Sequence, residues 1–108
     1  MTTGKKLNQY IVNSLEDIKA FDISVIDVRK KTSITDFMII ASANSNRQTK
    51  ALAKHLKDKL KSINYVNINI EGDKDGEWVL VDLNDVLVHI MLPTTRAYYN
   101  LEQLWQSS

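Results

Sequence analysis

The apolar residues near the start of the chain recur every three or four positions. Over about residues 5–19 this spacing, with polar side chains on the opposite face, predicts an amphipathic helix. A second helix is predicted to start at Ser45, because Ser45 and Gln48 have the spacing of a capping box. One face of this second helix carries Leu52, Leu56, Leu60 and Ile63. Both helices are therefore expected to bury one face.

Five short stretches are rich in β-branched residues and are predicted to be strands. They are Ile23–Val28, Phe37–Ala41, Val66–Ile70, Trp78–Val81 and Val86–Met91. The apolar residues of the third stretch alternate with asparagines, which is typical of a half-exposed strand. Asn84 and Asp85 suit a tight turn before the last strand, because Asn and Asp tolerate positive φ.

The last segment is predicted to be one helix. Pro93 ends the preceding strand, and Thr94 or Thr95 is expected to cap this helix. It carries Tyr98, Leu101, Leu104 and Trp105. The element order predicts a parallel strand–helix–strand crossover, with antiparallel pairing wherever the turns are short. We therefore expect an α/β (or α+β) fold, in which a mixed five-stranded sheet is flanked by helices.

The length of 108 residues suits a single domain over 1–108, with an ordered core at about 5–105. The content of 44% hydrophobic and 25% charged residues is typical of a soluble globular protein. The absence of cysteine excludes disulfides, thiolate metal sites and thiol catalysis. No apolar signal segment follows the first residues, and the longest apolar run, Val86–Leu92, is too short to span a bilayer. We expect a cytoplasmic protein without membrane contact.

The charged residues nearly balance, with 14 basic and 13 acidic side chains and a net charge of +1. A domain that binds nucleic acid mainly through phosphates is usually more basic. The charge therefore favours a protein partner. Arg47, Lys50, Lys54, Lys57 and Lys61 share one face of the second helix, as either a solvated face or an RNA contact.

Patterns typical of catalysis are missing. His55 and His89 stand alone, without the spacing of metal ligands. The loop at 42–45, between a strand and a helix, contains no glycine, so the signal for phosphate binding is weak. Asp82 and Asp85 are three positions apart, which on a strand places them on opposite faces. We expect no metal, no cofactor and no enzymatic activity.

Binding features are better supported. Trp78, Leu80 and Asp82 share one face of a strand, and burying that face would leave the Asp82 carboxylate without an evident partner. An exposed face with tryptophan and leucine beside an acid is typical of a protein interface. The alternative is that Trp78 belongs to the core. His89 is either an ordinary sheet histidine or a partner contact, and Trp105 either packs the last helix or anchors an interface.

Several motifs together resemble the ribosomal silencing factor family, also called the RsfS or Iojap family. The matching segments, in order, are 33–40, 45–48, 71–72, 78–83, 85–91 and 96–105. The most specific features are the Trp78, Asp82, Asp85 and His89 spacing and the Leu-Glu-x-Leu-Trp ending at 101–105. Gln48 stands where relatives often carry histidine. The resemblance extends from about residue 7 to 105.

This resemblance implies a function and a partner. Members of the family bind ribosomal protein number fourteen of the large subunit, on the face that meets the small subunit. They thereby block an intersubunit bridge and the joining of subunits, and they repress translation when nutrients are short. The fold is expected to be similar to nucleotidyltransferases without their catalytic motifs. Homodimers and a secondary contact with ribosomal RNA through the basic face of the second helix are also expected.

The residue types and the resemblance together indicate which side chains dock on the ribosomal protein. The expected contacts are Trp78, Leu80, Asp82, His89, Met91, Tyr98 and Trp105, with Arg96 and Glu102 as a polar rim. The alternative function is a large-subunit assembly factor that uses the same surface. A third alternative, a cryptic nucleotidyltransferase, would need a second strand-borne acid beside a Gly-Ser turn, and the sequence has neither.

Overall fold

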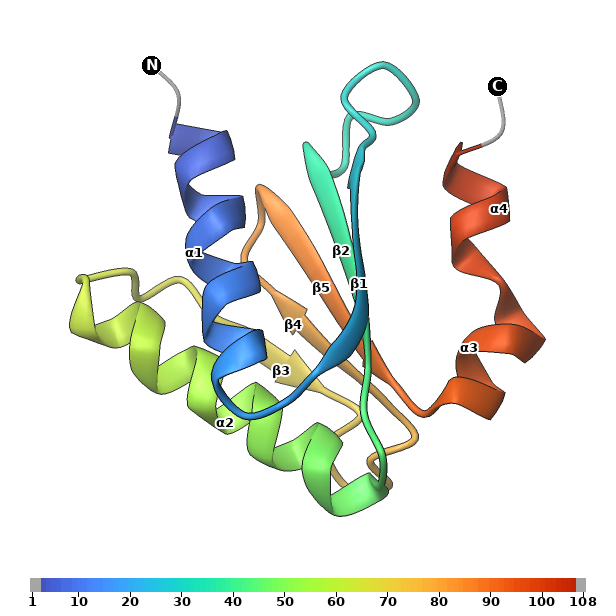
Figure 1. The fold of residues 1–108 in the computed structure, drawn as a ribbon. Coiled ribbons are helices and arrows are strands. Elements are labelled where there is room, and N and C mark those ends of the chain that lie inside the picture. The colour runs from blue at the N-terminus through green and yellow to red at the C-terminus, as the bar shows by residue number, and fades with distance from the viewer. Residues whose placement is uncertain (1–2, 107–108) are drawn as a thin grey trace.

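The computed structural model describes residues 3–106 of the chain (Figure 1). The elements in order are α1 (Thr3–Asp17), β1 (Phe21–Asp27), β2 (Phe37–Ser42), α2 (Asn46–Ser62), β3 (Asn69–Glu71), β4 (Trp78–Asp82), β5 (Val86–Met91), α3 (Pro93–Tyr99) and α4 (Leu101–Gln106). The helix predicted over about 5–19 thus begins and ends slightly earlier. The sequence predicted an ordered core at about 5–105. Of the residues beyond that core, 1–2 and 107–108 are outside the described residues.

The five strands form one mixed sheet in the order β1-β2-β5-β4-β3, which confirms the predicted α+β fold. β2 and β5 pair in parallel at the centre, and every other pair is antiparallel. β3 runs in the same direction as β2 but lies at the far edge of the sheet, so the crossover through α2 passes over β5 and β4. The turn before β5 is confirmed, since Asn84 has a φ of 72°.

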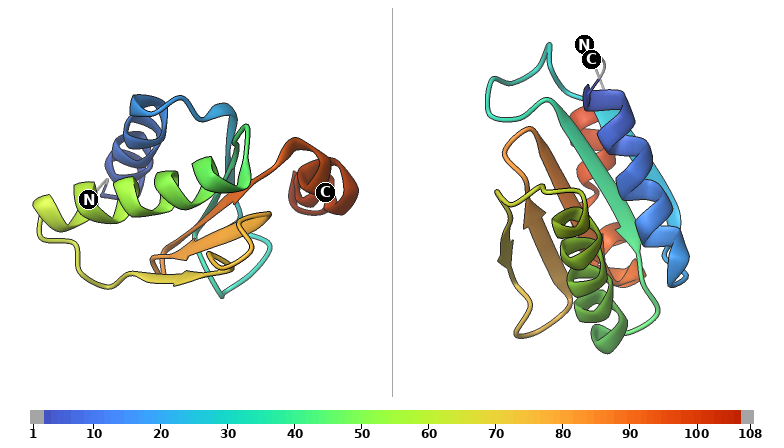
Figure 2. Two further views of the ribbon diagram at one scale, coloured as in Figure 1. Left: turned by 90° about the horizontal axis from the view of Figure 1, so that it is seen from below. Right: turned by 90° about the vertical axis from the view of Figure 1, so that its left-hand side faces the viewer.

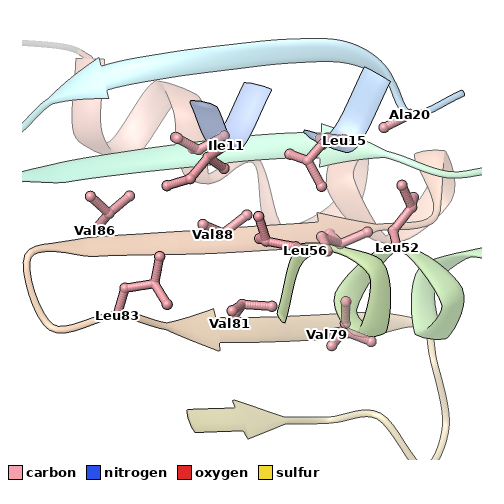
Figure 3. Packing of buried hydrophobic residues seen from close by; sticks show 14 of the residues in the cluster. Ile11, Leu15, Ala20, Leu52, Leu56, Val79, Val81, Leu83, Val86 and Val88 are labelled. Carbon is pink, nitrogen blue, oxygen red and sulfur yellow. The ribbon is translucent and has the colours of Figure 1, made fainter. Parts of the chain in front are cut away.

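Helices cover both faces of the sheet, as the view from below shows (Figure 2). α1 and α2 lie on one face, and α3 and α4 lie on the other (Figures 1 and 2). The main core forms under α1 and α2, where Ile11, Leu15, Leu52 and Leu56 are completely buried. These side chains point toward valines of β4 and β5, such as Val88 (Figure 3). No helix within residues 3–106 has both the length and the apolar content needed to cross a membrane.

β3 is shorter than the strand predicted over Val66–Ile70. The backbone N–H of Ile68 donates to the carbonyl of Val66, a local turn that is incompatible with an extended ladder at these residues. Only Asn69–Glu71 pairs with β4. Val66 is consequently 76% exposed, and the prediction of a strand there was wrong.

The last segment is broken into two helices, where the sequence predicted one. Asn100 adopts the left-handed conformation, with a φ of 48° and a ψ of 54°, and it ends α3. The predicted cap was also wrong, because α3 begins at Pro93, before either threonine, and Leu92 provides no side-chain cap. The break turns α4 back along the sheet (Figure 1).

The N-terminus of α2 is tied to the loop before β4. Ser45 caps the helix as predicted, accepting from the N–H of Gln48. The Thr49 hydroxyl donates to the carbonyl of Gly76 at 2.5 Å. Gly76 has a φ of 77°, and a Cβ atom there would lie 2.6 Å from the carbonyl oxygen of Asn46. Only glycine fits this contact without displacement of the helix terminus.

We expect Gly76→Ala to lower the free energy of unfolding by about 2 kcal/mol or more. The energetic cost of a positive φ for alanine and the cost of the clash between its Cβ atom and the backbone add to each other. Asp75→Ala, in the same exposed loop, changes the neighbouring side chain but leaves the Gly76 contact intact, so it should cost about 0.5 kcal/mol or less. Chemical denaturation of both variants provides the measurement. Equal stabilities would contradict a tight contact between the loop and α2.

Candidate docking surface

The sheet face that carries α3 and α4 is only partly covered. In the register of the sheet, Leu80 lies opposite His89, and Asp82 lies opposite Leu87. On this face we define the open face as Trp78, Leu80, Asp82, Leu87 and His89. Its residues from β4 are half-buried, as is Leu87, so this part of the sheet is accessible at the surface. This agrees with the alternative in which the Trp78 strand face is exposed.

Trp78 has both a packing role and an accessible side. Its indole N–H donates to Nδ1 of His89 at 3.0 Å. Its ring lies 4.8 Å, between centroids, from the ring of Tyr99 on α3. It also packs against a second core cluster, which consists of Ile26, Val28, Met38, Ile40 and Met91. Leu80 and His89 line a hollow of about 240 Å³ beside it. Trp78 is therefore a fixed aromatic side chain at the border of the second core cluster, so core and surface are not exclusive alternatives here.

His89 is buried, with 6% of its surface exposed. Burial lowers its pKa to about 4, because the charged imidazolium would lose its hydration. Since Nδ1 accepts from Trp78, the proton of the neutral ring is on Nε2, which has no hydrogen-bond partner among the described residues. The open face therefore carries a neutral histidine at physiological pH. Its predicted contact with a partner stays a prediction.

Met91, one of the predicted docking residues, is completely buried. It lies opposite Trp78 in the sheet and packs with Ile26 and Ile40 beneath the C-terminal helices. Its side chain is covered in this structure, and the predicted contact of Met91 with a partner stays a prediction. The alternation of a strand places Met91 on the correct face, but α3, α4 and Trp78 cover that end of it.

Arg96 and Glu102 form a polar clamp between the C-terminal helices and the first two strands. The guanidinium binds the carboxylate through two bonds, Nε to Oε1 at 2.8 Å and Nη2 to Oε2 at 3.0 Å. Nη1 of Arg96 donates to Ser42 on β2 at 2.8 Å, and the hydroxyl of Ser24 on β1 donates to Glu102 at 2.8 Å. These hydrogen bonds, first of all those from Arg96, lower the pKa of Glu102.

The clamp holds the C-terminal arm, which we define as residues 93–106. Neither of its helices contains a fully buried residue, so burial alone stabilises it weakly. Leu101 and Trp105 are half-buried against the second cluster, and Lys31 donates a hydrogen bond to the carbonyl of Trp105. Packing of Trp105 on the sheet is thereby confirmed. Arg96 and Glu102 make internal bonds, and their predicted rim role remains untested.

The arm exposes several large apolar side chains. Tyr98 is 82% exposed and does not pack the helix on the sheet. Leu104 is 66% exposed, and Tyr99, which the sequence did not single out, is 53% exposed while it contacts Trp78. A continuous helix would place positions 98 and 105 on one face, whereas the break at Asn100 separates them. Sequence periodicity therefore could not identify Tyr99.

The basic face of α2 is a second, separate surface. Arg47, Lys50, Lys54 and Lys61 are exposed and Lys57 is half-buried. Lys54 pairs with Asp58 at 3.3 Å, whereas the other four have no ion pair within residues 3–106. Because α2 lies on the opposite side of the sheet from the arm, the structure does not bring this basic face together with the open face (Figure 2).

Comparison with known proteins identifies the family of this chain. The sequence model of the family described as "Ribosomal silencing factor during starvation" (RsfS) matches residues 2–108. The chain belongs to the RsfS family. The resemblance that the sequence motifs indicated is thereby confirmed.

Several known proteins are similar to this RsfS family chain in sequence, and a solved structure is similar in fold. "Ribosomal silencing factor RsfS" of Chromobacterium violaceum is 46% identical over 94% of this chain and 83% of its own length. A crystal structure of a protein from the same species, 45% identical, superimposes with a TM-score of 0.91 over 96% of this chain and 87% of that chain. "Mitochondrial assembly of ribosomal large subunit protein 1" of Mus musculus is 35% identical over 88% of this chain and 43% of its own length.

The clamp generates a prediction about pH. Glu102 has a lowered pKa in the folded chain, so its contribution to stability is present above the ordinary value of 4.5 and is lost as the pH falls through the folded value. Glu102→Gln should therefore destabilise the protein at pH 7, and the difference from the unmodified chain should shrink toward pH 3. Denaturant titrations at several pH values measure both curves. A difference that does not depend on pH would show that the carboxylate charge contributes nothing.

Proposed function

We propose that the protein docks on the large ribosomal subunit and prevents joining with the small subunit. Membership of the RsfS family and the names of its relatives support a ribosome-associated role. The finer proposal, a contact with ribosomal protein number fourteen that blocks an intersubunit bridge, follows from the family resemblance. The protein acts by occupying a surface rather than by catalysis, so its effect depends on affinity and concentration.

One observation supports this proposed docking site most directly. The open face and the exposed side of the C-terminal arm meet at the contact between Trp78 and Tyr99, and Tyr98 packs edge-on against Tyr99 with 5.0 Å between ring centroids. Aromatic side chains that are already held in place lose little entropy on binding, and such anchors dominate interface energies. The half-buried Leu80 and Asp82 extend this apolar centre with a carboxylate at its border.

Subunit joining is the direct test of the function. Purified small and large subunits are mixed with the protein and separated on a sucrose gradient. We expect fewer joined ribosomes, and the protein in the large-subunit peak. Sedimentation of the free protein, which we propose is a homodimer, should be measured first to establish the stoichiometry. Unchanged joining together with absence from the large-subunit peak would refute the proposal.

Tyr98 provides the sharpest test of the surface, because removing its ring should not affect the core. We expect Tyr98→Ala to weaken large-subunit binding by about 2 kcal/mol, or about 30-fold, with little change in melting temperature. Val66→Ala is the matched control, since Val66 is 76% exposed and lies outside both the open face and the arm. Equal affinities of the two variants would exclude Tyr98 from the interface.

A second candidate is assembly of the large subunit through the same surface. The name of the mouse relative, which refers to assembly of the mitochondrial large subunit, favours this function. Deletion of the gene should then cause large-subunit precursors to accumulate during rapid growth. A pure silencer should instead leave precursors unchanged and reduce survival in starvation. The two phenotypes therefore distinguish the candidates.

We further propose that the basic face of α2 contacts ribosomal RNA. Each phosphate contact contributes about one unit to the slope of log affinity against log salt. Lys50→Gln with Lys61→Gln should thus lower that slope by about one to two units. Lys30→Gln with Lys74→Gln removes the same charge elsewhere and should leave the slope nearly unchanged. If both pairs behave alike, the α2 face is only solvated.

A further inference from the structure

A cavity of about 470 Å³ lies on the opposite side of the sheet from the C-terminal arm. Its walls come from the start of α1, the starts of β2 and β5, and the chain that follows α2. The blue start of α1 and the yellow-green chain after α2 lie on the same side of the sheet (Figure 1). The volume is within the usual range of small-molecule sites, roughly 300–1,000 Å³.

The floor of this cavity is apolar. Leu7, Phe37, Ile63 and Val86 contribute hydrocarbon or aromatic surface. Ile63 was predicted to complete the buried face of α2, but the helix ends at Ser62, and Ile63 is 47% exposed at the cavity instead. An apolar residue left at the mouth of a hollow favours a ligand with an apolar body.

Two acidic residues, Asp36 and Asp85, contribute to the rim. The N–H groups of Asp36 and Phe37 both donate to the carbonyl of Asp85, at 3.0 and 3.1 Å, so the two acidic residues are neighbours across the starts of β2 and β5. Both are exposed, and neither has an ion pair in the described part of the chain. Lys6 also lines the cavity, which leaves the rim with a net charge of about −1.

Two tyrosines complete the wall with fixed rings. The hydroxyl of Tyr10 donates to the carbonyl of Lys59 at 2.9 Å, and that of Tyr65 donates to the carbonyl of Leu83 at 2.7 Å. Each phenol oxygen keeps accepting capacity. The ammonium group of Lys59 already lies 6.0 Å from the centroid of the Tyr10 ring, so the ring of Tyr65 is the one we expect to attract a cation. Burial and then the negative charges of Asp85 and Asp82 raise the pKa of Tyr65, which agrees with a negative potential at this wall.

We propose that this cavity is a binding site for a small organic cation with an apolar body, such as an arylalkylamine. Its hydrocarbon part lies on the floor formed by Leu7, Phe37 and Val86, and its ammonium group lies near the carboxylates of Asp36 and Asp85. Neither the open face nor the arm contributes a residue to the cavity. Binding here is therefore independent of the proposed docking on the ribosome.

The first test uses the unmodified chain and three probes of similar shape. Phenethylamine, phenethyl alcohol and phenylacetate are titrated into isotope-labelled protein and followed by NMR. We expect phenethylamine to shift the amide signals of Leu7, Ile63 and Val86, while those of Leu80 and Tyr98 remain unchanged. The alcohol should bind about fivefold more weakly or worse, and phenylacetate more weakly still. Equal binding of the amine and the alcohol, or shifts only outside the cavity, would overturn the proposal.

The second test removes the carboxylates. Asp36→Asn with Asp85→Asn should reduce the affinity for phenethylamine about fivefold, to that of the alcohol. Asp73→Asn with Asp75→Asn changes the charge equally, in a loop outside the cavity, and should leave the affinity unchanged. If the first double variant keeps a native spectrum and full affinity, the carboxylates do not bind the cation. Should that variant not fold, the three probes on the unmodified chain still decide the matter.

Discussion

The parallel pairing of β2 with β5 is the constraint on which the rest of the molecule depends. All six residues of β2 are buried, because helices cover both of its faces and strands flank both of its edges. A strand in this position can be almost continuously apolar, as parallel central strands usually are. The pairing joins residues about fifty positions apart, and it brings Ile40 beside His89 and Ser42 beside Met91. One register thereby sets the second cluster, the Ser42 end of the clamp and the carboxylate rim of the cavity.

The features that depend only on neighbouring residues in the sequence were predicted correctly. The apolar stripe of α2, its serine cap and the turn at Asn84 each follow from neighbouring residues, and each was found. Val66–Ile70 and the last helix were predicted incorrectly for a different reason. At Val66 the alternation is genuine but no partner strand is present, and at Asn100 a tolerated left-handed residue breaks a favourable helical pattern.

For the candidate docking surface, the sequence predicts which residues share a side of the sheet, but not which of them are exposed there. Alternation along β4 and β5 correctly groups Trp78, Leu80 and His89, since a strand has only two sides. Whether a residue on that side is accessible depends on where the C-terminal arm crosses it. That crossing buries Met91 and leaves Tyr98 exposed, and it results from the break at Asn100 together with the Arg96 bonds. Arg96 donates to Ser42 on β2 and, at 3.3 Å, to Ser24 on β1, and neither serine is close to it in sequence.

The weak burial of the arm affects how tightly any partner can bind. A segment held mainly by a few polar bonds can open locally while the sheet stays folded, and such local openings cost less free energy than global unfolding. Opening would displace Tyr98 and Tyr99 and would remove the cover from Met91. A partner that needs the closed arm binds only the closed fraction of molecules, so its apparent dissociation constant is the intrinsic value divided by that fraction. The strength of the clamp therefore also determines the apparent affinity for a partner. Arg96 affects that affinity even if it does not contact the partner.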